Sequence, residues 1–159
     1  HDKEYPKNLK GLDNAPGVLY CIGNVSKADE NAVAIVGTRK MTYYGREVTE
    51  KFAGELASLG ITIVSGLARG IDTVAHKSAL AVGGRTIAVI ASGLDNIYPP
   101  ENIKLAQDIV GKGGAIISEY PLGYPALPNN FPSRNRIVSG HQQCSLLHTA
   151  PCVLQFPLY

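Results

Sequence analysis

Short apolar runs alternate along the chain with longer segments in which apolar residues recur at helical spacing. The runs read AVAIVG, ITIVSG, TIAVIAS and AIISEY, and they cover residues 32–37, 61–66, 86–92 and 115–120. A continuous apolar run of this length is typical of a strand that is buried on both faces. We therefore expect a sheet built from these strands, with helices packed on both sides.

Three helices are expected between these strands, over residues 44–59, 71–84 and 100–114. Strands that alternate with helices of this length are connected by right-handed crossovers, which produce a parallel sheet. The pattern predicts an α/β fold with a three-layer, mostly parallel, doubly wound sheet. The apolar positions expected on the buried helix sides are Val48, Phe52, Leu56 and Leu59 in the first helix, Ile71, Val74, Ala75, Ser78 and Ala79 in the second, and Ile103, Ala106 and Val110 in the third.

The chain of 159 residues is long enough for one domain with a buried core. Residues 1–31 are rich in Pro, Asn and Gly, and we expect a lead-in with an edge strand near residues 18–23. Residues 32–140 carry the alternation and are expected to form the core. Residues 141–159 break the alternation, which predicts a sheet truncated on its C-terminal side. The chain opens on His1 rather than Met, so we expect a fragment or a processed product.

Charge and cysteine content exclude several classes of function. The net charge of +2 is too small to indicate nucleic-acid binding by the global field, so any such function depends on local clustering. The three cysteines, Cys21, Cys144 and Cys152, are too widely spaced for a zinc site or a disulfide framework. No apolar run approaches the ~18 residues of a membrane helix. We expect a cytoplasmic protein with no metal site and no membrane partner.

Glycines and arginines follow the predicted strands repeatedly. Ligands of doubly wound sheets bind outside the carboxyl ends of the strands, where the loops converge. Glycines there allow a ligand to approach the backbone, and each following helix directs its positive dipole end to the same place. Arg suits phosphate because its planar fork makes paired, charge-assisted hydrogen bonds. The arginines of these loops are Arg39, Arg69, Arg134 and Arg136, and the aromatic residues that could stack on bases are Tyr43, Tyr44 and Phe131.

Simpler interpretations exist for several of these residues. A glycine after a strand is most often only a turn. Asp72 lies in the first turn of its helix, where the alternative role is to complement the helix dipole. His76 follows one turn later, so the two side chains could pair, although a buried histidine bonded to the protein is at least as common. The chain contains no GxGxxG, P-loop, HExxH or GxSxG motif, which leaves dinucleotide, metalloprotease and hydrolase functions without support.

Five segments, in this order and spacing, resemble the DNA-processing protein A family, also called DprA or Smf. They read VAIVGTRKMTYYG, ITIVSGLARGIDTVAHKSAL, GGRTIAVIASGLDNIYPPEN, GAIISEYPLG and NNFPSRNRIVSG, and the resemblance covers about residues 5–140. It implies an extended Rossmann-like domain that binds single-stranded DNA without strong sequence preference and loads a RecA-type recombinase, in natural transformation, commonly as a homodimer. It implies neither a nucleotide cofactor nor an enzymatic activity.

The resemblance also implies which residues contact DNA. They lie in the first glycine loop, in the second glycine loop and in the FPxRNRI segment: Gly37, Arg39, Lys40, Gly66, Arg69, Gly70, Phe131, Arg134, Asn135 and Arg136. The four arginines would hold phosphates and Phe131 would offer a stacking face, whereas Lys40 could as easily point to water. Structural support of the site is expected from Ser65, Asp72 and His76.

The segment from His141 to Tyr159 matches none of the strand and helix units with which the family pattern continues. The resemblance implies that these units supply much of the dimer contact, so their loss argues against a homodimer of this chain. The stretch CVLQF within this segment is compatible with a short strand. The alternative function is an enzyme that resembles the lysine-decarboxylase-like phosphoribohydrolases. Those enzymes carry a PGGxGTxxE motif that this chain lacks, but Glu119 does end a strand at the same edge.

Overall fold

The computed structural model of the protein describes residues 5–12, 14–140, 144–149 and 153–155. The strands in these residues are β1 (Tyr20–Gly23), β2 (Ala32–Gly37), β3 (Thr62–Ser65), β4 (Thr86–Val89), β5 (Ala115–Ser118), β6 (Cys144–Thr149) and β7 (Val153–Gln155). The helices are α1 (Lys7–Lys10), α2 (Tyr43–Ser58), α3 (Ile71–Ala81), α4 (Ile103–Gly111) and α5 (Asn130–Gly140), with 3₁₀ turns η1 (Lys27–Glu30) and η2 (Pro100–Asn102).

All of these strands belong to one sheet, in the order β1-β5-β4-β3-β2-β6-β7. The strands from β5 to β6 run parallel, whereas β1 and β7 are antiparallel at the two edges. The edge strand expected near residues 18–23 is therefore confirmed as β1. From β2 the chain moves outward to β5 and then returns to place β6 on the other side of β2. This reversal is the doubly wound arrangement. Because β2 to β5 run parallel, their carboxyl ends lie at one edge of the sheet.

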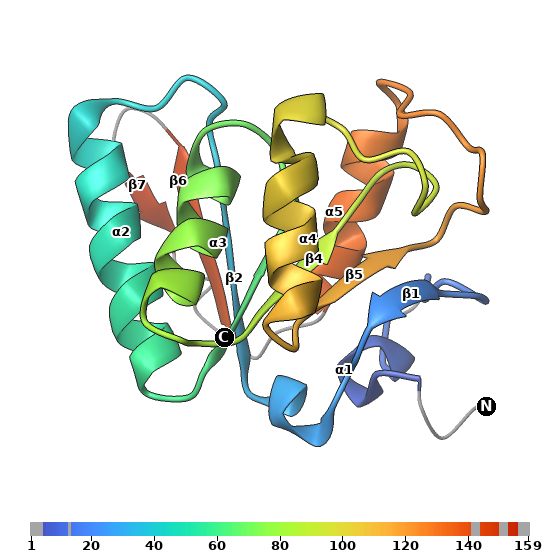
Figure 1. The fold of residues 1–159 in the computed structure, drawn as a ribbon, viewed down its shortest axis with the longest axis horizontal. Helices are drawn as coiled ribbons and strands as arrows, with labels where there is room; N and C mark the ends of the chain where they lie inside the picture. Colours follow the sequence, from blue (N-terminus) through green and yellow to red (C-terminus); the bar gives the residue numbers. More distant parts are fainter. Residues whose placement is uncertain (1–4, 13, 141–143, 150–152, 156–159) are drawn as a thin grey trace.

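Helices cover both faces of the sheet (Figure 1): α2, α3 and α4 lie on one face, and α1 and α5 lie on the other. Successive residues of a strand point to opposite faces. Ile87 and Val89 of β4 thus pack in a cluster with Leu9 of α1 and Ile137 of α5. Ala88, between them, packs in the cluster that includes α4. Burial on both faces explains the continuous apolar runs and confirms the three-layer α/β fold.

The buried side of α2 differs from the prediction. Phe52 and Leu59, which were expected there, are exposed, and Val48 and Leu56 are only partly buried. The buried residues of α2 are instead the small ones, namely Gly45, Thr49, Ala53 and Ala57. Small side chains allow two backbones to approach closely, and α2 packs against α3 and β3. Close approach of the helices, rather than apolar volume, therefore decides which side of α2 is buried.

The buried side of α4 is also rotated from the prediction. Ile103 is 44% exposed and Val110 is only partly buried, whereas Leu105, Ala106 and Ile109 are buried. Leu105, Ala106 and Ile109 pack in one core cluster with Ala88 of β4 and Ile116 of β5, so the side of α4 that carries them is the one that faces the sheet. In α3 the expected side is confirmed for Ile71, Val74, Ala75 and Ala79, while Ser78 is only partly buried.

Two segments after β5 correct the sequence predictions. The long loop expected over residues 119–140 contains a helix, α5, which carries the whole RNR segment. Beyond it, β6 pairs in parallel with Val33–Gly37 of β2, and β7 pairs with β6, so the sheet continues past residue 140 instead of ending there. The added strand satisfies the outer backbone groups of β2, which makes β2 an inner strand. Residues 31 and 140 remain predicted domain boundaries.

Candidate nucleic-acid interface

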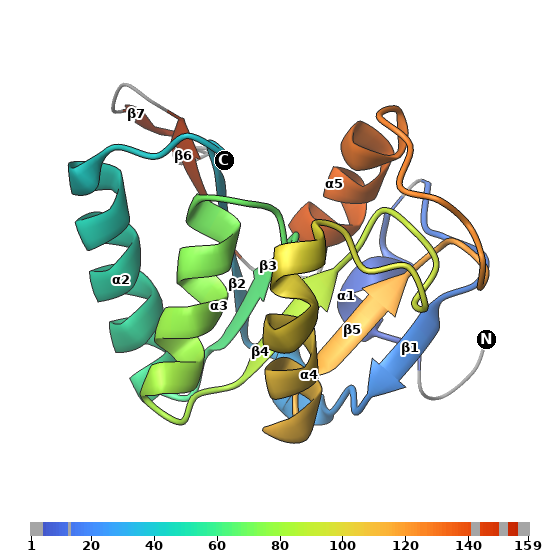
Figure 2. The same ribbon diagram turned by 45° about the horizontal axis from the view of Figure 1, so that its top comes forward.

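Three loops and the start of α5 meet at the carboxyl ends of the parallel strands (Figure 2). Arg39 comes from the loop after β2, Arg69 from the loop after β3, Tyr98 from the loop after β4, and Phe131 from the first turn of α5. We call these four residues the rim. The Arg39 guanidinium lies 5.1 Å from the Phe131 ring centroid, and the Arg69 guanidinium lies 6.0 Å from the Tyr98 centroid. The two rings meet edge to face at 6.0 Å, so the rim is continuous.

The rim combines the two chemistries that single-stranded nucleic acid requires. Arg39 and Arg69 are exposed, and 39% of the surface of Tyr98 is accessible to solvent. A small hollow between the arginines and the rings is lined in addition by Ala68 and Pro99. Exposed guanidinium groups can bind phosphates, and aromatic rings can stack on bases without reading their sequence.

Gly70 positions the loop that carries Arg39. Its φ of +77° is in the left-handed region, where L side chains are strained. A Cβ atom here would overlap the carbonyl oxygen of Thr38 and would lie 2.9 Å from the Cα of Arg39. The next residue, Ile71, donates its N–H to the same Thr38 oxygen at 3.3 Å. Gly70 therefore allows the loop after β3 to lie close to the loop after β2. This is a structural role, which differs from contact with a phosphate.

Asp72 accepts hydrogen bonds from backbone N–H groups of the glycine loops that were expected to bind a phosphate. Its Oδ2 accepts the N–H of Gly66 at 3.0 Å and that of Ala68 at 3.4 Å, and the N–H of Gly37 also stabilises the carboxylate. Burial raises the pKa of Asp72, while the charge of Arg134 and these N–H groups oppose the rise. The interpretation of Asp72 as a brace of the loop agrees with this geometry, whereas direct phosphate binding by the N–H of Gly66 does not.

Arg134 lies beneath the rim rather than on it. Its side chain is 4% exposed, and Nη1 donates to the carbonyl oxygen of Val89 at 2.6 Å. Its guanidinium fills the space next to the Cα of Gly66, where a Cβ atom would overlap it. Burial lowers the pKa of Arg134, and the charge of Asp72 partly restores it. The buried position corrects the prediction of Arg134 as an accessible phosphate ligand, because helix α5 turns this side chain inward.

Of the remaining residues predicted to contact DNA, Arg136 is bonded to other parts of the protein, whereas Lys40 and Asn135 are exposed. Arg136 is bonded to the Glu119 carboxylate and, at 2.8 Å, to the carbonyl oxygen of Asn14. It therefore ties α5 to the N-terminal segment and does not join the rim. Lys40 and Asn135 are exposed, beside Arg39 and on α5 respectively. Their contact with DNA stays a prediction.

Ser65 and His76 stabilise the elements behind the rim. Ser65 Oγ donates to the carbonyl oxygen of Ile35 at 2.6 Å and links β3 to β2. Thr86 Oγ1 donates to the carbonyl oxygen of Ile63, so His76 Nδ1, 2.7 Å from Thr86 Oγ1, is the donor of that pair. His76 is thus bonded to β4 and not to Asp72. Its Nε2 is buried without a hydrogen-bond partner.

The environment of His76 predicts a loss of stability in mild acid. Burial lowers its pKa from 6.5 to about 3, so the folded protein keeps it neutral while the unfolded chain takes up a proton below pH 6.5. Stability from this group is complete above pH 6.5 and falls as the pH decreases, by about 2 kcal/mol at pH 5. Urea unfolding at pH 7 and pH 5 measures the loss.

The matched variant is His76→Asn, whose amide can replace the Nδ1 donor but does not titrate. We expect its stability to change much less between the two pH values, even though its absolute stability is lower. Equal stability of the unsubstituted protein at pH 7 and pH 5 would contradict this account of His76.

Sequence reasoning missed two residues at this edge, Tyr98 and Glu101. Both lie in the loop and turn after β4, in the segment YPPEN. Tyr98 could have been predicted, because it lies in the loop after a buried strand and that loop was expected at the same edge of the sheet as Arg39 and Arg69. Glu101 had no such signal, because its partner Arg69 is distant in the sequence and only the fold brings the two together.

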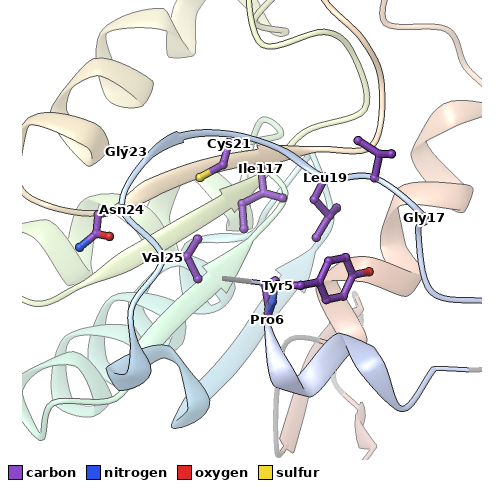
Figure 3. A pocket seen from close by; sticks show the side chains of 10 residues that line it. Tyr5, Pro6, Gly17, Leu19, Cys21, Gly23, Asn24, Val25 and Ile117 are labelled. Atoms are coloured by element: carbon purple, nitrogen blue, oxygen red, sulfur yellow. The ribbon is translucent and has the colours of Figure 1, made fainter. Parts of the chain in front are cut away.

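A larger hollow lies elsewhere, beneath β1, with a volume of about 540 Å³. Figure 3 shows Leu19, Val25 and Ile117 gathered around it with Tyr5. None of its lining residues is charged, so it lacks the groups that bind phosphate. Within the described ranges there is also no cluster of three or more potential metal ligands, and no helix has the length and apolar character needed to cross a membrane.

Known proteins of one family are similar to this chain along most of its length. The family model of DNA recombination-mediator protein A matches residues 1–152. The chain belongs to this family. Protein Smf of Escherichia coli is 46% identical over 136 residues, which cover 86% of this chain and 36% of that protein. DNA processing protein DprA of Bacillus subtilis is 42% identical over 139 residues, which cover 87% of this chain and 46% of that protein.

Solved structures of the family share the fold. The X-ray structure of DprA from Streptococcus pneumoniae has a TM-score of 0.85 and 42% identity, and the match covers 92% of this chain and 51% of that one. DprA of Helicobacter pylori, studied for its single-stranded DNA binding mode, has a TM-score of 0.82 and 36% identity, with 93% of this chain and 68% of that one covered. The resemblance predicted from the motifs is confirmed.

The extent of the match adds two facts. The chain spans 33–49% of the length of the curated relatives it matches. The family model also continues past residue 140 to residue 152, into the segment where the motifs indicate a departure. The strand β6 lies in this matched part, so the expected departure from the family is contradicted for residues 141–152.

Proposed function

We propose that this protein binds single-stranded DNA along the rim, without strong sequence preference, as a mediator of DNA recombination. The observation that carries the proposal is the continuous chain of contacts from Arg39 through Phe131 and Tyr98 to Arg69. Two exposed cations flank two rings, which suits a strand whose phosphates and unstacked bases are both accessible. The Helicobacter pylori relative studied for its single-stranded DNA binding supports the same function.

Binding rather than catalysis is proposed because the carboxylates at this edge are bonded to the protein. Asp72 accepts hydrogen bonds from backbone N–H groups, and Glu101 is paired with Arg69. Oε2 of Glu119 is paired with Arg136, and its Oε1 is buried without a hydrogen-bond partner. A phosphoribohydrolase function would need Glu119 as its catalytic carboxylate. Hydrolysis of nucleoside monophosphates that disappears in Glu119→Gln would support that alternative.

The recombination role is proposed from membership in the family. It includes help in loading a RecA-type recombinase onto incoming DNA during natural transformation, in the cytoplasm. A homodimer is part of the same proposal. Co-sedimentation with a recombinase on oligo-dT, and the mass of the protein in solution, test these two parts separately from DNA binding.

The direct test is a binding isotherm with fluorescent oligo-dT at 50 mM and 200 mM salt. We expect nanomolar to micromolar affinity at the lower salt and a steep loss at the higher, because neutralised phosphates release counterions. Arg39→Ala should weaken binding about tenfold, since it removes both a phosphate contact and the cation over Phe131.

The control for charge is Lys104→Ala, which removes an exposed cation from α4, outside the rim. We expect its isotherm to match that of the unsubstituted protein. Equal affinities for the Arg39 and Lys104 variants across the salt titration would overturn the assignment of the rim.

A further inference from the structure

We propose that Glu101 competes with DNA phosphates for Arg69 and thereby limits the affinity of the rim. The inference rests on the proposed function and concerns the regulation of the same surface. Arg69 Nε donates to Glu101 Oε1 across 32 residues of sequence, from the loop after β3 to the turn η2. Both side chains are 51% exposed, so the pair lies at the surface where a strand would pass.

The two cations of the rim are not equivalent in the free protein. Arg69 is neutralised by Glu101 and lies near the Tyr98 ring. Arg39 is in no ion pair with any described residue and faces the Phe131 ring. Of the two rim arginines, Arg39 is therefore the one whose positive charge no described carboxylate compensates. A phosphate that binds Arg69 must displace or share the carboxylate of Glu101.

The same pairing occurs in the hollow beside the rim. This hollow lies between α2 and α3 and is lined by Arg69 and Glu101 together with Arg46, Glu50 and Lys77. Arg46 Nε donates to Glu50 Oε1 at 2.7 Å, so both arginines of the hollow are bonded to a glutamate. The two pairs compensate the charges of Arg46 and Arg69 in the free protein. They restrict the binding surface on the side of Arg69.

Removal of the carboxylate should therefore strengthen binding. Glu101→Gln keeps the size and the polar character of the side chain but frees the Arg69 charge and removes repulsion between Glu101 and a phosphate. One carboxylate about 4–6 Å from a phosphate in water corresponds to an affinity change of about threefold to sixfold. One further phosphate contact on a single strand also steepens the logarithmic salt dependence by about 0.7.

The opposite role for Glu101 makes the opposite prediction. If the carboxylate held Arg69 in a position that DNA requires, Glu101→Gln would weaken binding. The sign of the change thus separates a competitor from a positioning residue, and a thermal melt of each variant checks that the fold is retained.

The experiment measures oligo-dT anisotropy for the unsubstituted protein and four variants at 50 mM and 200 mM salt. Asp108→Asn is the matched control, because it removes the same charge from an exposed position on α4, further along the chain from the rim. Arg69→Ala and Arg69→Ala/Glu101→Gln complete a double-mutant cycle. We expect Glu101→Gln to bind more tightly than Asp108→Asn, and its gain to vanish when Arg69 is absent.

The outcomes separate the two proposals. Binding by the unsubstituted protein with an equal or weaker affinity for Glu101→Gln overturns the inference on Glu101 and leaves the proposed function intact. A gain that persists in the Arg69→Ala background also overturns it, since the effect would then be a general charge effect. No binding of oligo-dT by any variant at 50 mM salt overturns the proposed function itself.

Discussion

Arg134→Met is expected to destabilise the protein by about 3–5 kcal/mol, because it leaves the buried Asp72 carboxylate without the opposite charge that acts on it. Arg134 is 4% exposed, fills the space beside Gly66, and donates to the Val89 carbonyl oxygen. Burial raises the pKa of Asp72, and the charge of Arg134 opposes this rise. Urea unfolding of the variant measures the loss, and Lys104→Met on the exposed surface of α4 is expected to change stability little.

A double-mutant cycle tests whether the charge of Asp72 causes the loss. Asn at position 72 can still accept the N–H of Gly66 without carrying a charge. Arg134→Met/Asp72→Asn should therefore lose less stability than the sum of the two single variants. The loss of stability caused by Arg134→Met should also become smaller in acid. The pKa of Asp72 is raised in the folded protein, so as the pH falls the folded protein binds a proton there before the unfolded chain does. A neutral Asp72 no longer needs the charge of Arg134. Additive losses at every pH would contradict the electrostatic explanation.

Gly70→Ala is expected to weaken binding of oligo-dT about tenfold or more and to destabilise the fold by about 2–3 kcal/mol. The added Cβ would overlap the Thr38 carbonyl oxygen and would lie 2.9 Å from the Arg39 Cα. The loop after β2 must then move, and Arg39 moves away from Phe131. Anisotropy with oligo-dT measures the first effect, and thermal unfolding measures the second.

Gly83 provides a matched control for backbone strain. Its φ is +70°, close to the +77° of Gly70, but nothing lies within 4 Å of a Cβ built on it. Gly83→Ala therefore carries the cost of a left-handed alanine, about 1–2 kcal/mol, without the clash. We expect it to melt at a lower temperature and to bind DNA normally. A Gly83→Ala variant that loses as much affinity as Gly70→Ala would show that stability, and not the position of Arg39, controls binding.

The unequal roles of the arginines explain why the site could be predicted only in part. Arg39 and Arg69 follow strands directly, and a loop at a strand end is exposed, so their placement follows from local sequence. Arg134 and Arg136 lie in a helix, where a shift of two positions turns the side chain from the interior to the N-terminal segment. We expected this segment to be a loop, and a loop gives no basis for predicting that Arg134 is buried while Arg136 contacts the N-terminal segment.

The sequence by itself determined the α/β class, the inner strands and the edge at which the cations gather, because a continuous apolar run is a local property that burial on both faces requires. Tertiary structure alone decided the small-residue side of α2, the burial of Arg134 and the pairing of Arg69 with Glu101. Each of these depends on the distance between elements that are remote in the chain. That distance is set by how closely helices pack on the sheet, and no local pattern of residue types records it.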